Sequence, residues 1–256
     1  MANINIISHR GANIYAPQNT LPAFRRGLAL GADGFETDVH STKDGVLVLC
    51  HNYSIDKTSN GKGLIAQMTL EALRSYDFGS YFSQKFEGTK IPTLDEFLEL
   101  VAESSLQVLN IELKSPKENE TNIVFETINA VKEHGLFDRL LISSFDPALL
   151  AEAKRVDPKT RTGFLYSPNS KVTFKIIHRN MLTVAKEIGA DALHPFSLYV
   201  NKALVDAAHD AGMEINVWTV NSPKSVLRMA ALGVEGLITD YPDVVRGVLE
   251  AHGWLK

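Results

Sequence analysis

Cysteine is nearly absent from this chain, which has a single one, Cys50, in 256 residues. One cysteine excludes an internal disulfide framework and is consistent with a reducing compartment. We therefore interpret Cys50 as a small apolar residue buried in a strand. Long apolar runs are missing as well. Nowhere in the sequence do about 18 apolar residues follow one another, so it indicates no membrane span.

An excess of one charge is also missing. The sequence has 26 Lys and Arg against 30 Asp and Glu, for a formal net charge of −4. Nucleic-acid binding requires a clustered Lys/Arg face, so we expect small soluble substrates and no nucleic-acid partner. The start, Met1 to Ile7, lacks the basic residues and long apolar stretch of a secretory signal. We expect a cytoplasmic protein without stable membrane insertion; the oligomeric state, a homo-oligomer included, stays open.

Short β-branched and apolar runs alternate with helical patterns along the whole chain. Eight strands are expected, at Asn5–Ser8, Gly34–Val39, Val108–Leu113, Leu140–Ser143, Arg161–Leu165, Ala192–His194, Ile215–Thr219 and Gly236–Ile238. Eight strands alternating with helices at this length favour an α/β fold, a closed (β/α)8 TIM barrel, over an open doubly wound sheet. Catalytic residues of such a barrel lie at the carboxyl ends of its strands.

One stretch, residues 46–92, is longer than a strand-to-helix loop requires. It is predicted to contain a short strand at Val46–Cys50 and a helix around Thr69–Tyr76. We interpret it as an insertion after the second strand within one domain that spans residues 1–256. Its aromatic residues, Tyr76, Phe78, Tyr81, Phe82 and Phe86, make it a candidate determinant of substrate specificity.

Three carboxylates fall on neighbouring expected strands. Glu36 and Asp38 are separated by one residue, so both side chains lie on the same face of a strand. Glu112 would join them from the next strand. Three oxygen donors suit one divalent cation, Mg²⁺ or Ca²⁺, with positions left for water and substrate. The alternative is that Glu36 or Asp38 is a helix cap or a surface charge.

Cations and imidazoles accompany the carboxylates. Arg10 and Lys114 can hold a phosphate diester, the arginine through its planar fork and the lysine as a point charge. His9 and His51 can act as general acid and general base, because imidazole titrates near neutral pH. Lysines on barrel strands also form Schiff bases, so an aldolase that uses Lys114 stays an alternative. The adjacent carboxylates disfavour it, since they keep the lysine protonated.

Several separated motifs of the chain closely resemble the glycerophosphodiester phosphodiesterase family. They are His9-Arg10-Gly11, Pro17-Gln18-Asn19-Thr20, Glu36-Thr37-Asp38, Glu112-x-Lys114, Val217-Trp218-Thr219 and Thr239-Asp240. The resemblance implies metal-dependent hydrolysis of a glycerophosphodiester to sn-glycerol 3-phosphate and an alcohol. It also implies that Trp218 forms an apolar wall of the substrate pocket, with packing in the barrel core as the competing interpretation.

Two positions depart from the family pattern. Gln18 stands where the family usually has Glu, and Asn52 follows His51 where the family often has Asp. These departures are the only support for a non-catalytic protein that binds a phosphate ligand. Family knowledge permits water or the glycerol 2-hydroxyl as nucleophile, the latter through a cyclic phosphate. The sequence decides neither the nucleophile, nor the alcohol, nor the metal.

Overall fold

A computed structural model of the chain describes residues 4–114, 122–167 and 180–255. Eight parallel strands close into a barrel, because β1 pairs with both β2 and β9. These strands are β1 Asn5–His9, β2 Gly34–Ser41, β4 Val108–Leu113, β5 Leu140–Ser144, β6 Arg161–Tyr166, β7 Ala192–Pro195, β8 Glu214–Val217 and β9 Gly236–Thr239. The predicted TIM barrel is confirmed.

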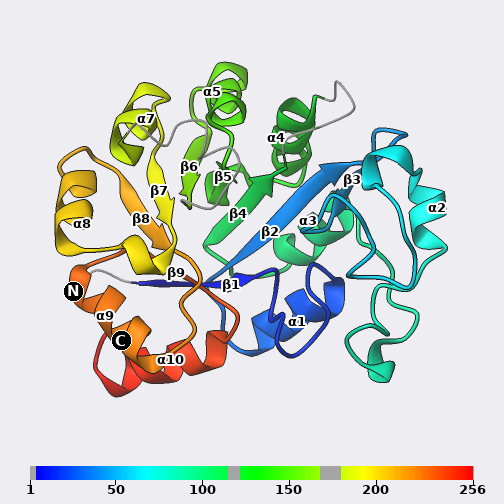
Figure 1. Ribbon diagram of the computed structural model, residues 1–256, viewed down its shortest axis with the longest axis horizontal. Helices are drawn as coiled ribbons and strands as arrows, with labels where there is room; N and C mark the ends of the chain where they lie inside the picture. The colour runs from blue at the N-terminus through cyan, green and yellow to red at the C-terminus, as the bar shows by residue number, and fades with distance from the viewer. Residues whose placement is uncertain (1–3, 115–121, 168–179, 256) are drawn as a thin grey trace.

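Helices surround the strands on the outside of the barrel (Figure 1). They are α1 Leu21–Ala29, α2 Leu70–Arg74, α3 Leu94–Ala102, α4 Ile123–Glu133, α5 Pro147–Val156, α7 Met181–Glu187, α8 Lys202–His209, α9 Pro223–Leu232 and α10 Pro242–Ala251. Short 3-10 turns are η1 Ile65–Gln67, η2 Gln84–Phe86, η3 Phe137–Arg139 and η4 Ser197–Tyr199. Within the three described ranges, no helix has the combination of length and apolar character that crossing a membrane requires.

The observed strands match the expected ones to within a few residues, and the clearest difference is at β8. The sequence predicts this strand up to Thr219, whereas β8 ends at Val217. Beyond Val217, pairing with the neighbouring strand is reduced to one isolated bridge between Phe196 and Trp218. Trp218 therefore lies just past the carboxyl end of β8.

Local signals in the sequence explain where several helices begin and end. The Ser222 hydroxyl caps α9 by accepting a hydrogen bond from the backbone N–H of Ser225. The helix ends at Gly233, whose φ of 87° is open to glycine without strain. Asp146 caps α5 in the same way, with Pro147 in the first turn, where its missing N–H has no consequence.

The main hydrophobic core lies between the strands and the surrounding helices. Phe35 of β2 meets Phe24 of α1 and Phe97 of α3, with ring centroids 5.1 Å and 6.1 Å away, and all three rings are fully buried. Truncating a buried phenylalanine of this kind to alanine costs about 3–5 kcal/mol of unfolding free energy. This packing fixes β2, which carries two of the candidate carboxylates.

The long segment between β2 and α3 has structure of its own. It begins with β3 Leu47–Leu49, which pairs antiparallel with β2, and continues through η1, α2 and η2. It also has a separate apolar cluster, whose buried members are Val48, Cys50, Ile55, Ile65, Leu73, Phe78 and Ile91. Cys50 is buried, as the sequence predicts, but it follows β3 and does not lie within the strand. The segment lies at one side of the barrel, next to β2 (Figure 1).

Candidate active site

Three carboxylates meet on the neighbouring strands β2 and β4. Glu36 and Asp38 share a face of β2, and Glu112 is the parallel partner of Asp38 in the register of the two strands. All three are buried, and one oxygen of each lies within 4.8 Å of the others. The predicted alternatives of a helix cap or a surface charge do not describe Glu36 or Asp38, which are 4 % and 0 % exposed inside the barrel.

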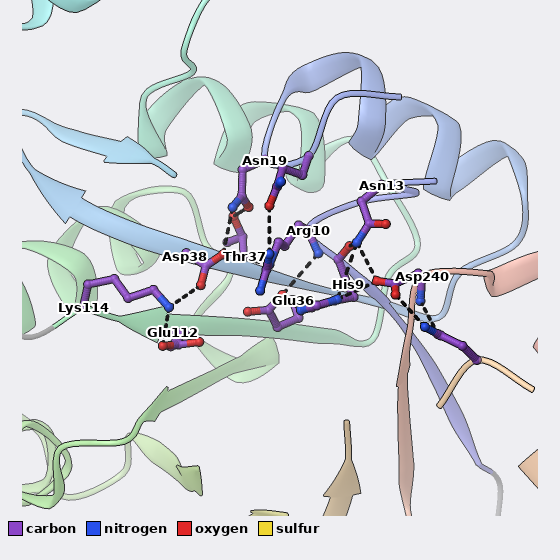
Figure 2. A network of polar contacts seen from close by, with 12 residues as sticks. His9, Arg10, Asn13, Asn19, Glu36, Thr37, Asp38, Glu112, Lys114 and Asp240 are labelled. Atoms are coloured by element: carbon purple, nitrogen blue, oxygen red, sulfur yellow. Dashed lines mark hydrogen bonds and ion pairs between the residues drawn. The ribbon is translucent and has the colours of Figure 1, made fainter. Parts of the chain in front are cut away.

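Two cations partly balance this negative charge. The Lys114 ammonium lies 2.6 Å from Asp38 Oδ1 and 2.5 Å from Glu112 Oε1. The Nε atom of Arg10 lies 3.4 Å from Asp38 Oδ2. Figure 2 shows Lys114 reaching Asp38 and Glu112 from one side, and Arg10 lying on the other side of Asp38, near Glu36. Asp38 is therefore held between both cations.

The charges shift the pKa values of the cluster in opposite directions. Burial would raise the pKa of Asp38, but Lys114 and Arg10 outweigh burial and lower it. Burial and the charge of Asp38 raise the pKa of Glu36 well above its ordinary value. Burial also raises the pKa of Glu112 to about 7, although Lys114 opposes the shift. Negative charge at Glu36 and Glu112 thus lacks full compensation from protein cations.

This donor set fits a hard divalent cation. It consists of carboxylate oxygens, and such cations prefer oxygen ligands. Lys114 engages Asp38 Oδ1 and Glu112 Oε1, and Asn19 and Arg10 contact Asp38 Oδ2, so an ion at this cluster would share the Asp38 oxygens with these donors. A bound cation would also supply the positive charge that Glu36 and Glu112 lack.

Lys114 itself stays protonated. Burial would lower its pKa, but Asp38 and Glu112 outweigh burial and raise it above its ordinary value. A protonated amine has no lone pair for attack on a carbonyl carbon. The Schiff-base alternative therefore finds no support at this lysine.

His9, the last residue of β1, is oriented by an aspartate that follows β9. Its Nδ1 atom lies 2.6 Å from Asp240 Oδ1, so the imidazole donates its Nδ1–H to an ionised carboxylate that can only accept. The Nε2 atom faces Glu36, at 3.8 Å from Oε2. Burial lowers the pKa of His9 and Asp240 opposes that shift, so a neutral ring with its Nε2 lone pair toward the site is favoured.

Asp240 is held in turn by two amides. Asn13 and Asn221 each donate a side-chain hydrogen bond to its carboxylate at 2.6 Å. Burial would raise the pKa of Asp240, but hydrogen bonds led by that of His9 lower it to about 2. In the sequence Asp240 belongs to the Thr239-Asp240 motif, and no role follows from that motif alone. Its one signal is its place just beyond the last expected strand, Gly236–Ile238.

The turn after β1 places Arg10 and Asn19 with unusual backbone geometry. Both have positive φ, 57° and 54°, which non-glycine residues rarely adopt. The backbone N–H of Arg10 donates to the Glu36 carbonyl at 2.9 Å. Asn19 donates to Asp38 Oδ2 at 2.8 Å and accepts from the Thr37 hydroxyl at 2.8 Å (Figure 2). Asn19 therefore positions Asp38.

His51 follows β3 and faces the same cavity as His9. Its Nδ1 atom lies 3.2 Å from the Asn52 side-chain oxygen, so the amide at this departure from the family pattern contacts the ring. Burial lowers the pKa of His51 to about 4, and Lys114 and Arg10 add to the effect while Asp38 opposes it. The ring is neutral at pH 7 in the absence of substrate.

A cavity of about 100 Å³ joins these groups. Its lining comprises His9, Arg10, Glu36, His51, Asn110, Glu112, Ser143, Phe145, Leu165, Trp218 and Ile238. Trp218 donates from Nε1 to the His194 carbonyl at 2.7 Å, and its ring contacts Phe145 and Phe196. Trp218 thus lines the cavity, and its contact with substrate there stays a prediction. Lys114 is not one of these lining residues, and its ammonium contacts Glu112, which is one.

Comparison with known proteins places the geometry in context. The model of the "Glycerophosphoryl diester phosphodiesterase family" matches residues 9–244. A glycerophosphodiester phosphodiesterase of Caldanaerobacter subterraneus is 36 % identical over 248 residues, which cover 97 % of this chain and 98 % of that protein. One from Bacillus altitudinis is 36 % identical over 240 residues, with coverage of 93 % and 95 %.

A solved structure agrees with these relatives. It is an Oleispira antarctica phosphodiesterase in complex with the product sn-glycerol-3-phosphate. This chain superposes on it with a TM-score of 0.83 and 26 % identity, and the match covers 96 % of each chain. The similarity therefore extends over almost the whole barrel.

Proposed function

Because this chain belongs to the glycerophosphoryl diester phosphodiesterase family, we propose that it hydrolyses glycerophosphodiesters to sn-glycerol 3-phosphate and an alcohol with the help of one divalent cation. The family consists of phosphoric diester hydrolases, and this chain is an enzyme of that class. One observation carries the finer assignment: two histidines, Arg10 and two carboxylates line one cavity, and Asp38 and Lys114 contact this group.

Glu36, Asp38 and Glu112 would hold the cation, which we propose to be Mg²⁺ or Ca²⁺. When bound, such an ion polarises a phosphoryl oxygen and neutralises charge on the diester. Arg10 offers guanidinium N–H groups to the phosphate, while Lys114 adds a fixed positive charge. Both cations are in place before substrate binds. They would therefore stabilise the negative charge that develops on the phosphoryl oxygens without having to move during the reaction.

His9 and His51 would exchange the protons. Diester hydrolysis takes one proton from the nucleophile, which is water or the glycerol 2-hydroxyl, and gives one to the leaving alcohol oxygen. His9 presents Nε2 toward Glu36, and Asp240 stabilises the imidazolium that forms when Nε2 accepts a proton. His51 lines the same cavity as His9, and we propose that the two rings act on different oxygens of one phosphate.

The direct test is release of glycerol 3-phosphate from glycerophosphocholine and glycerophosphoethanolamine. The assay compares Mg²⁺, Ca²⁺ and excess EDTA for the wild type, His51→Ala and His252→Ala. His252 is exposed on the last turn after α10 and serves as the matched control. We expect turnover that requires a divalent cation and falls by about 100-fold or more in His51→Ala, with His252→Ala unchanged.

Other outcomes would redirect the assignment. A folded protein that binds the cation but turns over neither substrate would favour a non-catalytic phosphate-binding role. Turnover that persists in EDTA would contradict the metal-dependent mechanism.

A further inference from the structure

Two buried polar side chains that line the active-site cavity have no hydrogen-bond partner. Both polar atoms of the Asn110 amide, Nδ2 and Oδ1, and the hydroxyl of Ser143 lack a partner among the described residues. Both residues are 0 % exposed, and both line the cavity. A buried polar group without a hydrogen bond lowers the stability of a fold, so most such groups are paired. Two of them in one cavity point to a ligand that supplies the missing hydrogen bonds.

The strand register places these two residues next to Glu112. Asn110 precedes Glu112 by two positions in β4, so their side chains share the face of the strand that lines the cavity. Ser143 is the register partner of Glu112 on β5. Asn110 is also the register partner of Glu36 on β2. The two unpaired groups are therefore neighbours of the carboxylates that would hold the cation.

The cavity has a floor and a mouth. Its floor consists of lining residues that lie within strands, namely Asn110, Ser143, Leu165 and Ile238. Arg10, Phe145 and Trp218 follow the carboxyl ends of their strands and lie at the mouth, where a barrel of this kind carries its active site. A phosphate held by Arg10 therefore directs one of its two alcohol groups into the floor. Because strand residues enclose the floor, it suits the group that all glycerophosphodiesters share, the glycerol.

A hydroxyl group matches the unpaired atoms of the floor better than an anion or a cation. An amide offers two N–H donors and a carbonyl acceptor, and a serine hydroxyl both donates and accepts. A phosphate oxygen only accepts, so it would leave the Asn110 carbonyl unpaired. A cation would leave the N–H groups of the amide unpaired. A hydroxyl donates and accepts at one atom, and the CH groups of glycerol can pack on Leu165 and Ile238.

We propose that Asn110 and Ser143 bind the terminal hydroxyl of the glycerol group, on the carbon farthest from the phosphate, and thereby select glycerol esters over esters of a diol. The inference rests on the proposed function. With the phosphate at the mouth, the terminal hydroxyl is the part of the glycerol that extends farthest into the floor. A substrate without this hydroxyl would leave both side chains unpaired in the complex, which is how a polar site rejects such an analogue.

The test compares two choline phosphodiesters that differ in one oxygen atom. One is glycerophosphocholine, and the other is its 1,2-propanediol analogue, which lacks only the terminal hydroxyl. kcat and KM are measured on both for the wild type, Asn110→Leu and Ser143→Ala. We expect the wild type to favour glycerophosphocholine in kcat/KM by about 100-fold or more. The preference should fall below about fivefold in Asn110→Leu and to an intermediate value in Ser143→Ala.

Thr127→Val is the matched control. Thr127 has a fully buried hydroxyl that also lacks a partner among the described residues, but it belongs to α4 and does not line the cavity. Its variant should keep the wild-type preference. Urea unfolding of the metal-free proteins shows whether each variant folds. Because the Asn110 amide has no partner in the fold, the unfolding midpoint of Asn110→Leu should not lie below that of the wild type. If Asn110→Leu does not fold, the preference of Ser143→Ala decides.

Other results overturn the proposal. Metal-dependent turnover of both esters with equal kcat/KM would leave the proposed function intact but show that the terminal hydroxyl is not recognised. A wild-type preference in both variants would mean that other residues bind the hydroxyl. A smaller Mg²⁺-induced shift in the melting temperature of Asn110→Leu would assign the amide to the cation.

The failure of the proposed function is a separate outcome. If the folded wild type cleaves neither ester with metal, calorimetry with sn-glycerol 3-phosphate and with 1,2-propanediol 1-phosphate tests the floor without turnover. Tighter binding of glycerol 3-phosphate that is lost in Asn110→Leu would support the floor as a hydroxyl site. Equal affinities in the wild type would overturn it.

Discussion

The imidazole of His9 lies 2.6 Å from the carboxylate of Asp240, although 231 positions separate the two residues along the chain. They meet because the first strand of the barrel pairs with the last, β1 with β9. Asn13 and Asn221 hold the same carboxylate from two further directions. Asp240 is therefore a positioning residue, which acts on the reaction through the orientation and proton affinity of His9.

Asp240→Asn should lower kcat by about 100-fold or more, since general acid–base catalysis is worth that much and the ring loses its fixed tautomer. KM should change little, because Asp240 does not face the phosphate site. The control is Asp243→Asn in α10, where the carboxylate accepts a hydrogen bond from the Tyr15 hydroxyl. Steady-state kinetics will compare kcat and KM of the two variants, and thermal melts will show whether either variant is destabilised. Equal kcat values in the two variants would show that the contact with His9 has no catalytic role.

Glu36→Gln should abolish turnover without destabilising the metal-free protein. Burial and the charge of Asp38 raise the pKa of Glu36. The ionised carboxylate therefore lowers the stability of the metal-free protein, and a neutral amide at this position avoids that destabilisation. A ligand at about 100 times its Kd stabilises a fold by about 2.7 kcal/mol, and the variant should lose that gain with Mg²⁺ or Ca²⁺. Melting temperatures with EDTA and with each cation provide the measurement. Glu250→Gln, at an exposed site, is the control. A cation-induced shift of wild-type size in Glu36→Gln would contradict the assigned ligand role.

Lys114→Met should strongly destabilise the metal-free protein. Removing the ammonium leaves Asp38 and Glu112 buried with one less cation, and breaking such a pair costs about 3–5 kcal/mol. A divalent cation should restore part of that loss, while turnover stays low because the phosphate loses a fixed charge. Urea unfolding with and without Mg²⁺ measures both effects. Lys202→Met breaks an exposed pair with Asp206 and should cost under about 1 kcal/mol. Comparable losses in the two variants would argue against a special role for the buried pair.

The barrel could be predicted from the sequence because each strand is a short apolar run between helical patterns, and parallel strands buried on both faces produce such runs. Glu36, Asp38 and Glu112 could be grouped for a similar reason. Strand alternation and the register of neighbouring strands place them together without knowledge of any loop. The ends of the strands were less certain, as at Trp218, because pairing there fades gradually.

Contacts that depend on loops could not be predicted. Asp240 meets His9 only because the barrel closes, and no local pattern of the sequence reports closure. Gln18 is a departure from the family pattern, and the sequence does not show that its side-chain oxygen accepts a hydrogen bond from Arg10 Nη1 at 2.8 Å. The conformation of the segment that carries Tyr81 depends on its own apolar cluster and on hydrogen bonds between its turns.

His194 should make the fold sensitive to mild acid. It is fully buried in β7, its Nε2 atom lies 3.0 Å from the Asn216 amide, and burial lowers its pKa to about 3 from an ordinary 6.5. Between pH 3 and pH 6.5, His194 is therefore protonated in the unfolded chain and neutral in the native state. The free energy of unfolding therefore falls with falling pH across this window, by about 1.4 kcal/mol per pH unit from this residue.

The comparison is with His194→Gln, which keeps a polar group but does not titrate. Urea unfolding at pH 7, 6, 5 and 4 should show that the wild type loses more stability than the variant, by about half of 1.4 kcal/mol between pH 7 and 6 and by about 1.4 kcal/mol per pH unit below pH 6. His40 and His51 also have lowered pKa values, about 3 and about 4, but both proteins contain them, so the difference in slope isolates His194. Parallel slopes would mean that His194 does not stay neutral in the native barrel. The hydrogen bond with Asn216 would then belong to a ring that can be protonated without opening the fold.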